Sequence, residues 1–174
     1  MARPPGQAEQ AERVSTLELF FDLVFVFTIT QLTAVLSDDP TPRGLLRVVL
    51  MLGVIFWMYD GYAWLTNAVA ADRAARRLVL LGGMAGFLVL ALTIPEAFSG
   101  GDLAFGLAYL VVVSIHAGLY SRTTVTHTVR ALVRLAPFNL VSALLVLAAV
   151  VAGGPAGYVL WAAAFALEWV TPLV

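Results

Sequence analysis

Six apolar segments fill most of this 174-residue chain, and each is near the roughly 20 residues that a helix needs to cross a bilayer. The segments lie at about residues 16–36, 44–69, 76–98, 102–121, 130–152 and 156–174. Hydrophobic residues make up 61% of the sequence and charged residues 12%, whereas a soluble domain is about half apolar and a quarter charged. The sequence therefore predicts an all-α, polytopic bundle of about six membrane-spanning helices.

The two ends of the chain differ in character. Residues 1–14 are polar and contain two prolines, so they predict a disordered cytoplasmic tail before a helical bundle of residues 15–174. The first apolar segment contains acids and lacks a small-residue cleavage site, so we expect a retained helix rather than a signal peptide. The last apolar segment ends at Val174 without a polar tail, and we expect the natural protein to continue beyond it.

Arginine supplies all ten basic residues, and its placement predicts the orientation in the membrane. Only Arg43 and Arg47 lie on one side of the predicted bundle. The other eight lie in the tail, around the loop after the second segment, or in the region where the fourth segment ends and the fifth begins: Arg3, Arg13, Arg73, Arg76, Arg77, Arg122, Arg130 and Arg134. Because arginine is enriched in cytoplasmic loops, both termini are predicted to be cytoplasmic, and the turns "SGGD" and "GGPAG" to face outward.

Five of the predicted helices each place one polar or ionisable side chain at a similar depth, on the cytoplasmic side of the bilayer centre. The depths follow from the segment bounds at about 1.5 Å per residue. These residues are Asp22, Asp60, His116, Asn139 and Glu168. Glu18 lies one turn before Asp22 on the same helix face. Carboxylates at bilayer depth are costly unless they face partners, so we expect Glu18 and Asp22 to point into the bundle.

Two interpretations of this polar layer remain open. In the first, it forms a site or a path for a proton or a cation, because ionisable groups within a membrane commonly serve function. In the second, it is a structural cluster that fixes helix packing. Glu18 also suits the positive end of the helix dipole. Gln31 lies opposite Asp22 on the helical wheel, which predicts that the first helix is surrounded by protein.

Other site classes find little support in the sequence. His116 has no second histidine near it in its helix, and the chain has no cysteine, so no metal site is expected. We find no nucleophile–base pair, phosphate-binding loop or basic patch for nucleic acid. We therefore expect neither an enzyme, nor a cofactor, nor a nucleic-acid partner. Gly82 and Gly86 form a small-xxx-small pattern that predicts close helix packing, with dimerisation as the alternative.

The stretch "ELFFDLVFVFTITQL" resembles the N-terminal signature of the bacterial low temperature requirement A family of integral membrane proteins. A second stretch, "YAWLTNAVAADRAARRLVLLGGMAGFLVLALTIPEAF", is similar to the pattern that follows it in that family. The resemblance covers residues 14–98, and beyond them it extends only to hydropathy. The motif positions that carry over are Glu18, Phe21, Asp22, Trp64, Asn67, Pro95 and Glu96.

The resemblance implies a multi-pass protein of the bacterial cytoplasmic (inner) membrane that is associated with growth at low temperature. It also implies a longer natural protein, since a later motif containing Leu-Gly-Glu is expected in the family and is absent here. The expected partners are the lipid bilayer and either a second copy or a missing C-terminal half. Two functions remain: proton- or cation-coupled transport through the acidic layer, or a non-catalytic assembly component whose polar layer serves packing.

Overall fold

The structure is a computed structural model that describes residues 16–68, 74–101, 103–121 and 128–170. Its elements are α1 (Thr16–Asp38), α2 (Pro42–Ala68), α3 (Ala74–Leu92), η1 (Ile94–Glu96), α4 (Ala104–Ser121), α5 (Thr128–Ala152) and α6 (Gly154–Val170). These ranges hold six α-helices and no strand, which confirms the all-α prediction. The predicted tail of residues 1–14 and the arginine-rich loop positions Arg73 and Arg122 lie outside the described residues.

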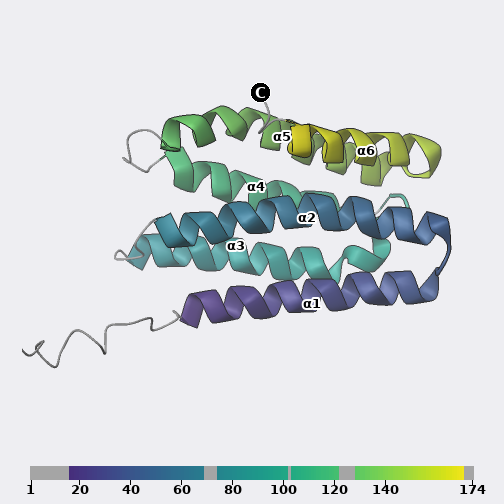
Figure 1. Cartoon of the computed structure of the whole chain (residues 1–174), viewed down its shortest axis with the longest axis horizontal. Helices are drawn as coiled ribbons and strands as arrows, with labels where there is room; N and C mark the ends of the chain where they lie inside the picture. Colours follow the sequence, from purple (N-terminus) through teal and green to yellow (C-terminus); the bar gives the residue numbers. More distant parts are fainter. Residues whose placement is uncertain (1–15, 69–73, 102, 122–127, 171–174) are drawn as a thin grey trace, which may run out of the picture.

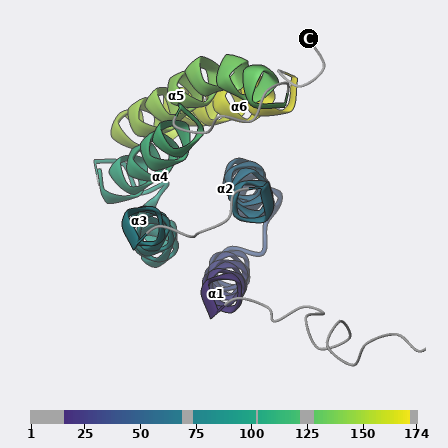
Figure 2. The same cartoon turned by 90° about the vertical axis from the view of Figure 1, so that its left-hand side faces the viewer.

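The helices lie side by side, and each runs opposite to the one before it (Figure 1). The view along the helices shows α1 at one edge of the bundle, α2 and α3 beside each other next to it, and α4, α5 and α6 beyond them (Figure 2). α1 packs on α2, α3 and η1, and α6 packs on α5 and α2. The prediction that the first helix is surrounded by protein is therefore wrong for the described residues.

The outer surface of the bundle is apolar. Leu23, Leu78 and Val159 are each about two-thirds exposed, and many other large aliphatic side chains are nearly as open. Among the described residues, three segments are long and apolar enough to cross a bilayer: Leu19–Asp38, Pro42–Trp64 and Leu135–Ala152. Two shorter apolar helices accompany them. Because water would penalise so large an apolar surface, the arrangement is that of a membrane protein.

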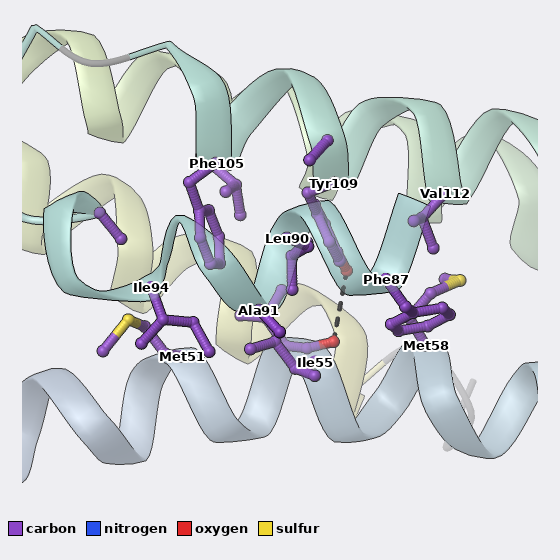
Figure 3. Close-up of a cluster of buried hydrophobic side chains, with 14 of the residues drawn as sticks. Met51, Ile55, Met58, Phe87, Leu90, Ala91, Ile94, Phe105, Tyr109 and Val112 are labelled. Atoms are coloured by element: carbon purple, nitrogen blue, oxygen red, sulfur yellow. Dashed lines mark hydrogen bonds between the residues drawn. The ribbon is translucent and has the colours of Figure 1, made fainter. Parts of the chain in front are cut away.

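The buried core draws on all six α-helices, and Figure 3 shows the part of it between α2, α3 and α4. Met51, Ile55 and Met58 of α2 face Phe87 and Leu90 of α3, all fully or almost fully buried, and residues of α4 close the cluster (Figure 3). Side-chain hydroxyls on the helices follow the rule that polar groups in lipid find partners internally. For example, the Thr28 and Ser114 hydroxyls each donate to the backbone oxygen four residues earlier.

Glycines allow the helices to approach closely. A Cβ atom on Gly86 would lie 2.8 Å from Val112 Cγ2, and one on Gly106 would lie 2.8 Å from the Leu147 Cα atom. A Cβ atom on Gly82 would lie 3.8 Å from Ile115 Cδ1, so this face of α3 packs on α4. The close packing predicted from the Gly82–Gly86 pattern is confirmed.

The third segment ends earlier than the sequence predicts. α3 stops at Leu92 rather than near residue 98, and η1 follows with Pro95 in its first turn. Proline cannot donate a backbone hydrogen bond, so it suits the start of a new turn and not the interior of α3. The Thr93 hydroxyl donates to the Leu90 carbonyl at 2.9 Å and helps to close the helix.

One end of the bundle brings together the turns that the sequence predicts to share a side. A Cβ atom on Gly153 would lie 3.3 Å from the Gly100 Cα atom, so the two glycine-rich turns touch. At α2 and α6, the Nε atoms of Arg43 and Arg47 both donate to the Tyr158 hydroxyl oxygen, at 3.0 and 2.6 Å. The side of the membrane that this end faces stays a prediction.

Candidate functional site

A cavity of about 190 Å³ opens between α2, α4 and α5. We call it the α2/α4/α5 cavity; its lining residues are Trp57, Met58, Asp60, Gly61, Trp64, Val113, His116, Ala117, Leu135, Ala136 and Asn139. Asp60, His116 and Asn139, each predicted for the polar layer, supply its polar groups apart from the indole N–H groups. Three residues that are far apart in the sequence, and that were predicted to lie at a similar depth, thus line one cavity.

Helical spacing explains how each element presents its part of the cavity. On α2, Trp57, Asp60 or Gly61, and Trp64 recur every three or four residues and so share one face. Val113, His116 and Ala117 do the same on α4. The Trp57 indole N–H donates to Asn139 Oδ1 at 3.2 Å, which joins α2 to α5 across the cavity. Asp60 is exposed at this site, whereas Asn139 is buried.

The His116 ring is held by its neighbours on α2. It is buried and stacks on the Tyr62 ring, with centroids 5.0 Å apart. A Cβ atom on Gly61 would lie only 3.0 Å from His116 Cε1 and Nε2, so the glycine makes room for the imidazole. The Tyr62 hydroxyl in turn donates to the Val112 carbonyl at 2.9 Å. The imidazole therefore has a fixed place in the cavity wall.

Glu168 of α6 lies in a separate buried cluster. The α5 member of this cluster, Ser142, follows Asn139 by one helical turn. Glu168 Oε1 accepts hydrogen bonds from the Tyr109 hydroxyl at 2.5 Å and from the Ser142 hydroxyl at 2.6 Å. All three side chains are almost fully buried, and they come from α6, α4 and α5. The Tyr109 oxygen also lies 3.4 Å from the Val54 carbonyl oxygen of α2, and a dashed line in Figure 3 leads from this hydroxyl. The Glu168 cluster thus links four helices.

The sequence predicts that Asp22 points into the bundle. It is exposed rather than enclosed within the bundle. The reason is that α1 lies at the edge, and its inward face is formed by Phe21, Val24 and Thr28 instead. Asp22 still has a partner, since its Oδ1 accepts a hydrogen bond of 2.7 Å from the Tyr59 hydroxyl on α2. The side chain of Glu18 lies outside the described residues.

The structure adds partners that the sequence did not single out. Tyr109 and Ser142 were not predicted for the site, because a lone tyrosine or serine in an apolar helix has many packing roles. Their position along the helices could have indicated them. Tyr109 lies two turns before His116 on α4, and Ser142 lies one turn after Asn139 on α5, so both are near the predicted polar layer. In the described part of the chain, no group of three His, Asp or Glu residues could hold a metal ion.

Comparison with known proteins identifies the family. Residues 13–174 match the family described as bacterial low temperature requirement A protein (LtrA). The chain belongs to this family. An uncharacterized protein of Rhizobium meliloti is 37% identical over 97 residues, which are 56% of this chain and 24% of that protein. The chain thus covers about a quarter of that relative's length. No solved structure matches significantly.

The LtrA match confirms the resemblance and extends it from residues 14–98 to almost the whole chain. With the apolar helices, it makes the chain a membrane protein of the low temperature requirement type. The motif residues now have places in the fold. Phe21 is buried and stacks on Tyr59 at 4.7 Å, while Trp64 lines the α2/α4/α5 cavity. Asn67 lies among residues whose side chains are not described.

Proposed function

We propose that this LtrA protein handles a proton or a cation at the α2/α4/α5 cavity, as part of a transport path across the bacterial cytoplasmic membrane. The observation that carries the proposal is that Asp60, His116 and Asn139, from three different helices, line one cavity in an apolar bundle. Ionisable groups in membrane helices are costly and rarely face lipid, so a shared cavity is where a function for them is expected.

Access distinguishes the acids of the layer. Asp60 is exposed at the cavity, whereas Glu168 is 1% exposed and holds two donors on one oxygen. A group that exchanges a proton or a cation must be reachable from outside. Asp60 is therefore the residue that we assign to exchange, with His116 and Asn139 as polar neighbours in the cavity wall.

The orientation of this path rests on the arginines. Eight of ten lie toward the tail and the loops after α2 and α4, which supports a cytoplasmic N-terminus. Asp60 and His116 lie in the C-terminal halves of α2 and α4, and Asn139 lies near the middle of α5. The cavity is thus proposed to be nearer to the cytoplasm, and the Tyr158 end of the bundle to face outward.

A second candidate is a non-catalytic component whose polar residues serve packing and assembly. The Glu168 cluster favours it, because the hydroxyls of Tyr109 and Ser142 tie α6 to α4 and α5 through one carboxylate oxygen. Polar hydrogen bonds between helices are a known means of holding membrane bundles together. Neither candidate assigns catalytic chemistry to the chain.

Flux through the reconstituted protein tests the first candidate. The full chain would be placed in liposomes, and proton and alkali-cation flux would be followed with internal dyes. Asp60→Asn keeps the size of the side chain and removes its charge, so flux should be lost. Asp38→Asn, a change to an exposed acid at the far end of α1, is the matched control and should retain flux. Equal flux in wild type and Asp60→Asn would rule out the proposal.

A further inference from the structure

We propose that the α2/α4/α5 cavity binds an organic ammonium group of about choline's size, with Asp60 as counter-charge and Trp57 and Trp64 as aromatic contacts. The inference rests on the proposed function, because it names the class of cation that the same site would take. It follows from three properties of the lining: how few oxygen ligands it has, where its indoles lie, and how large the space is.

The lining is poor in ligands for a bare metal ion. Eight of the eleven lining residues are apolar, aromatic or glycine, and the only oxygen-bearing side chains are those of Asp60 and Asn139. The Asn139 oxygen already accepts the Trp57 N–H. Calcium takes about 6–8 oxygen ligands, and magnesium needs near-ideal octahedral geometry. A single carboxylate in an apolar wall instead suits a cation whose charge is spread over carbon-bound hydrogens.

The two indoles lie on either side of the acid. Trp57 precedes Asp60 by three residues on α2, and Trp64 follows it by four, so all three side chains share one face. Tryptophan is the best aromatic partner for a cation, and methylated ammonium groups are commonly bound by aromatic side chains. The Trp57 indole N–H donates to Asn139 Oδ1 at 3.2 Å, which fixes this edge of the ring. The Asp60 carboxylate and the two indoles therefore line the same α2 side of the cavity.

The size of the space sets the size of the ligand. A cavity of about 190 Å³ is far larger than the roughly 10–15 Å³ that a single water needs. An apolar cavity of roughly 150 Å³ accepts a benzene-sized molecule. Choline is of that order, and its trimethylammonium head and short arm match the apolar lining. The ammonium group could belong to a free amine or to a lipid headgroup, and the two sources share this chemistry.

Binding of choline to the purified full chain tests the inference. The chain would be held in dodecyl maltoside, a detergent without an ammonium group, and titrated by calorimetry at constant ionic strength. The neutral carbon isostere 3,3-dimethyl-1-butanol and sodium chloride serve as comparison ligands. We expect saturable choline binding and at least about tenfold weaker binding of the isostere, because the isostere cannot pair with the carboxylate.

Variants then locate the binding. Asp60→Asn should weaken choline binding about tenfold or more, and Asp60→Glu should retain most of it because the charge remains. Trp64→Leu should weaken it about threefold or more. Asp38→Asn should bind as wild type. Unchanged helicity and elution volume would show that each variant is folded. Equal choline binding by wild type and Asp60→Asn, or equal binding of choline and the isostere, would overturn the inference.

Two further measurements are needed. The first distinguishes a lipid headgroup from a free amine as the source of the ammonium group, and the second distinguishes failure of this inference from failure of the proposed function. If phosphatidylethanolamine added to the micelles competes with choline and phosphatidylglycerol does not, the site accepts a lipid headgroup; if neither competes, it takes a free amine. Asp60-dependent proton or alkali-cation flux without choline binding would overturn this inference and leave the proposed function standing. Choline binding without flux of any cation would support this inference and refute transport.

Discussion

Replacing Tyr109 with phenylalanine removes the hydroxyl that donates to Glu168 Oε1 at 2.5 Å and leaves the ring in the core. Tyr109 is fully buried and Glu168 is 1% exposed, so water cannot replace the lost donor. Ser142 still donates to this oxygen in the variant, so the loss is that of one hydrogen bond, which contributes about 0.5–1.5 kcal/mol net in proteins generally. Measured hydrogen bonds between membrane helices average about 0.6 kcal/mol and reach about 1.7 kcal/mol. We therefore expect Tyr109→Phe to lower the free energy of unfolding by about 0.5–1.5 kcal/mol.

The second donor makes the test sharper. Ser142 donates to the same oxygen at 2.6 Å, so each single variant leaves Oε1 with one donor and the double variant leaves it with neither. Tyr109→Phe combined with Ser142→Ala should thus cost more than the sum of the two, by about 0.5–1 kcal/mol in a double-mutant cycle. The cycle would be measured by reversible unfolding in mixed micelles, followed by helix content.

Ser114→Ala is the control for the loss of a hydroxyl. Ser114 also lies on α4, but it is exposed and donates to the Leu110 carbonyl within its own helix. Its change should stay within about 0.5 kcal/mol, as for surface substitutions. If Tyr109→Phe and Ser142→Ala cost no more than this control and are additive, the Glu168 cluster does not hold the helices together. The packing candidate would then lose its main support.

Three further results are expected. A reporter fused after Gly100 should lie outside the cell and one after Arg76 inside, and the reverse pattern in alkaline phosphatase activity would refute the arginine argument. Gly106→Ala should destabilise the chain by about 1–3 kcal/mol in the unfolding assay, because the added Cβ would lie 2.8 Å from a backbone atom of α5, while Gly118→Ala, with no atom within 4 Å, should not. Tyr59→Phe should cost less than about 1 kcal/mol, because its bond to the carboxylate on α1 is exposed; a larger loss would show that this pair is enclosed by a partner.

Hydropathy predicted the six helices because each apolar segment of the sequence is near the length that a bilayer imposes, although only three described segments are long and apolar enough to cross it. The same arithmetic gave depth, and depth was enough to bring Asp60, His116 and Asn139 to one cavity. It gave no information on which helices are neighbours. Asp22 was therefore predicted to point inward although α1 lies at the edge of the bundle, where only one face of the helix meets protein.

Partners between helices were harder to predict than the acids they serve. Tyr109 and Ser142 are recognised as Glu168 donors only when α4, α5 and α6 are packed, since spacing within one helix relates residues of that helix alone. Trp57 lies one turn before Asp60 on α2, but its hydrogen bond to Asn139 joins residues 82 positions apart. The predicted bound near residue 98 was too late for a different reason, because apolar residues continue past Leu92 while Pro95 changes the backbone.

Two successive residues of α2 connect the acid of α1, Asp22, with the acid of the cavity, Asp60. Tyr59 donates to Asp22, and Asp60 is the next residue along the chain. Successive side chains of a helix point about 100° apart, so Tyr59 turns toward α1 while Asp60 turns toward α4 and α5. Phe21 and Phe25 stack on the Tyr59 ring at 4.7 and 4.0 Å, which fixes this turn of α2 from the α1 side. Asp22, Phe21 and Phe25 of α1 therefore contact the turn of α2 that carries the cavity carboxylate, although none of the described α1 residues lines the cavity.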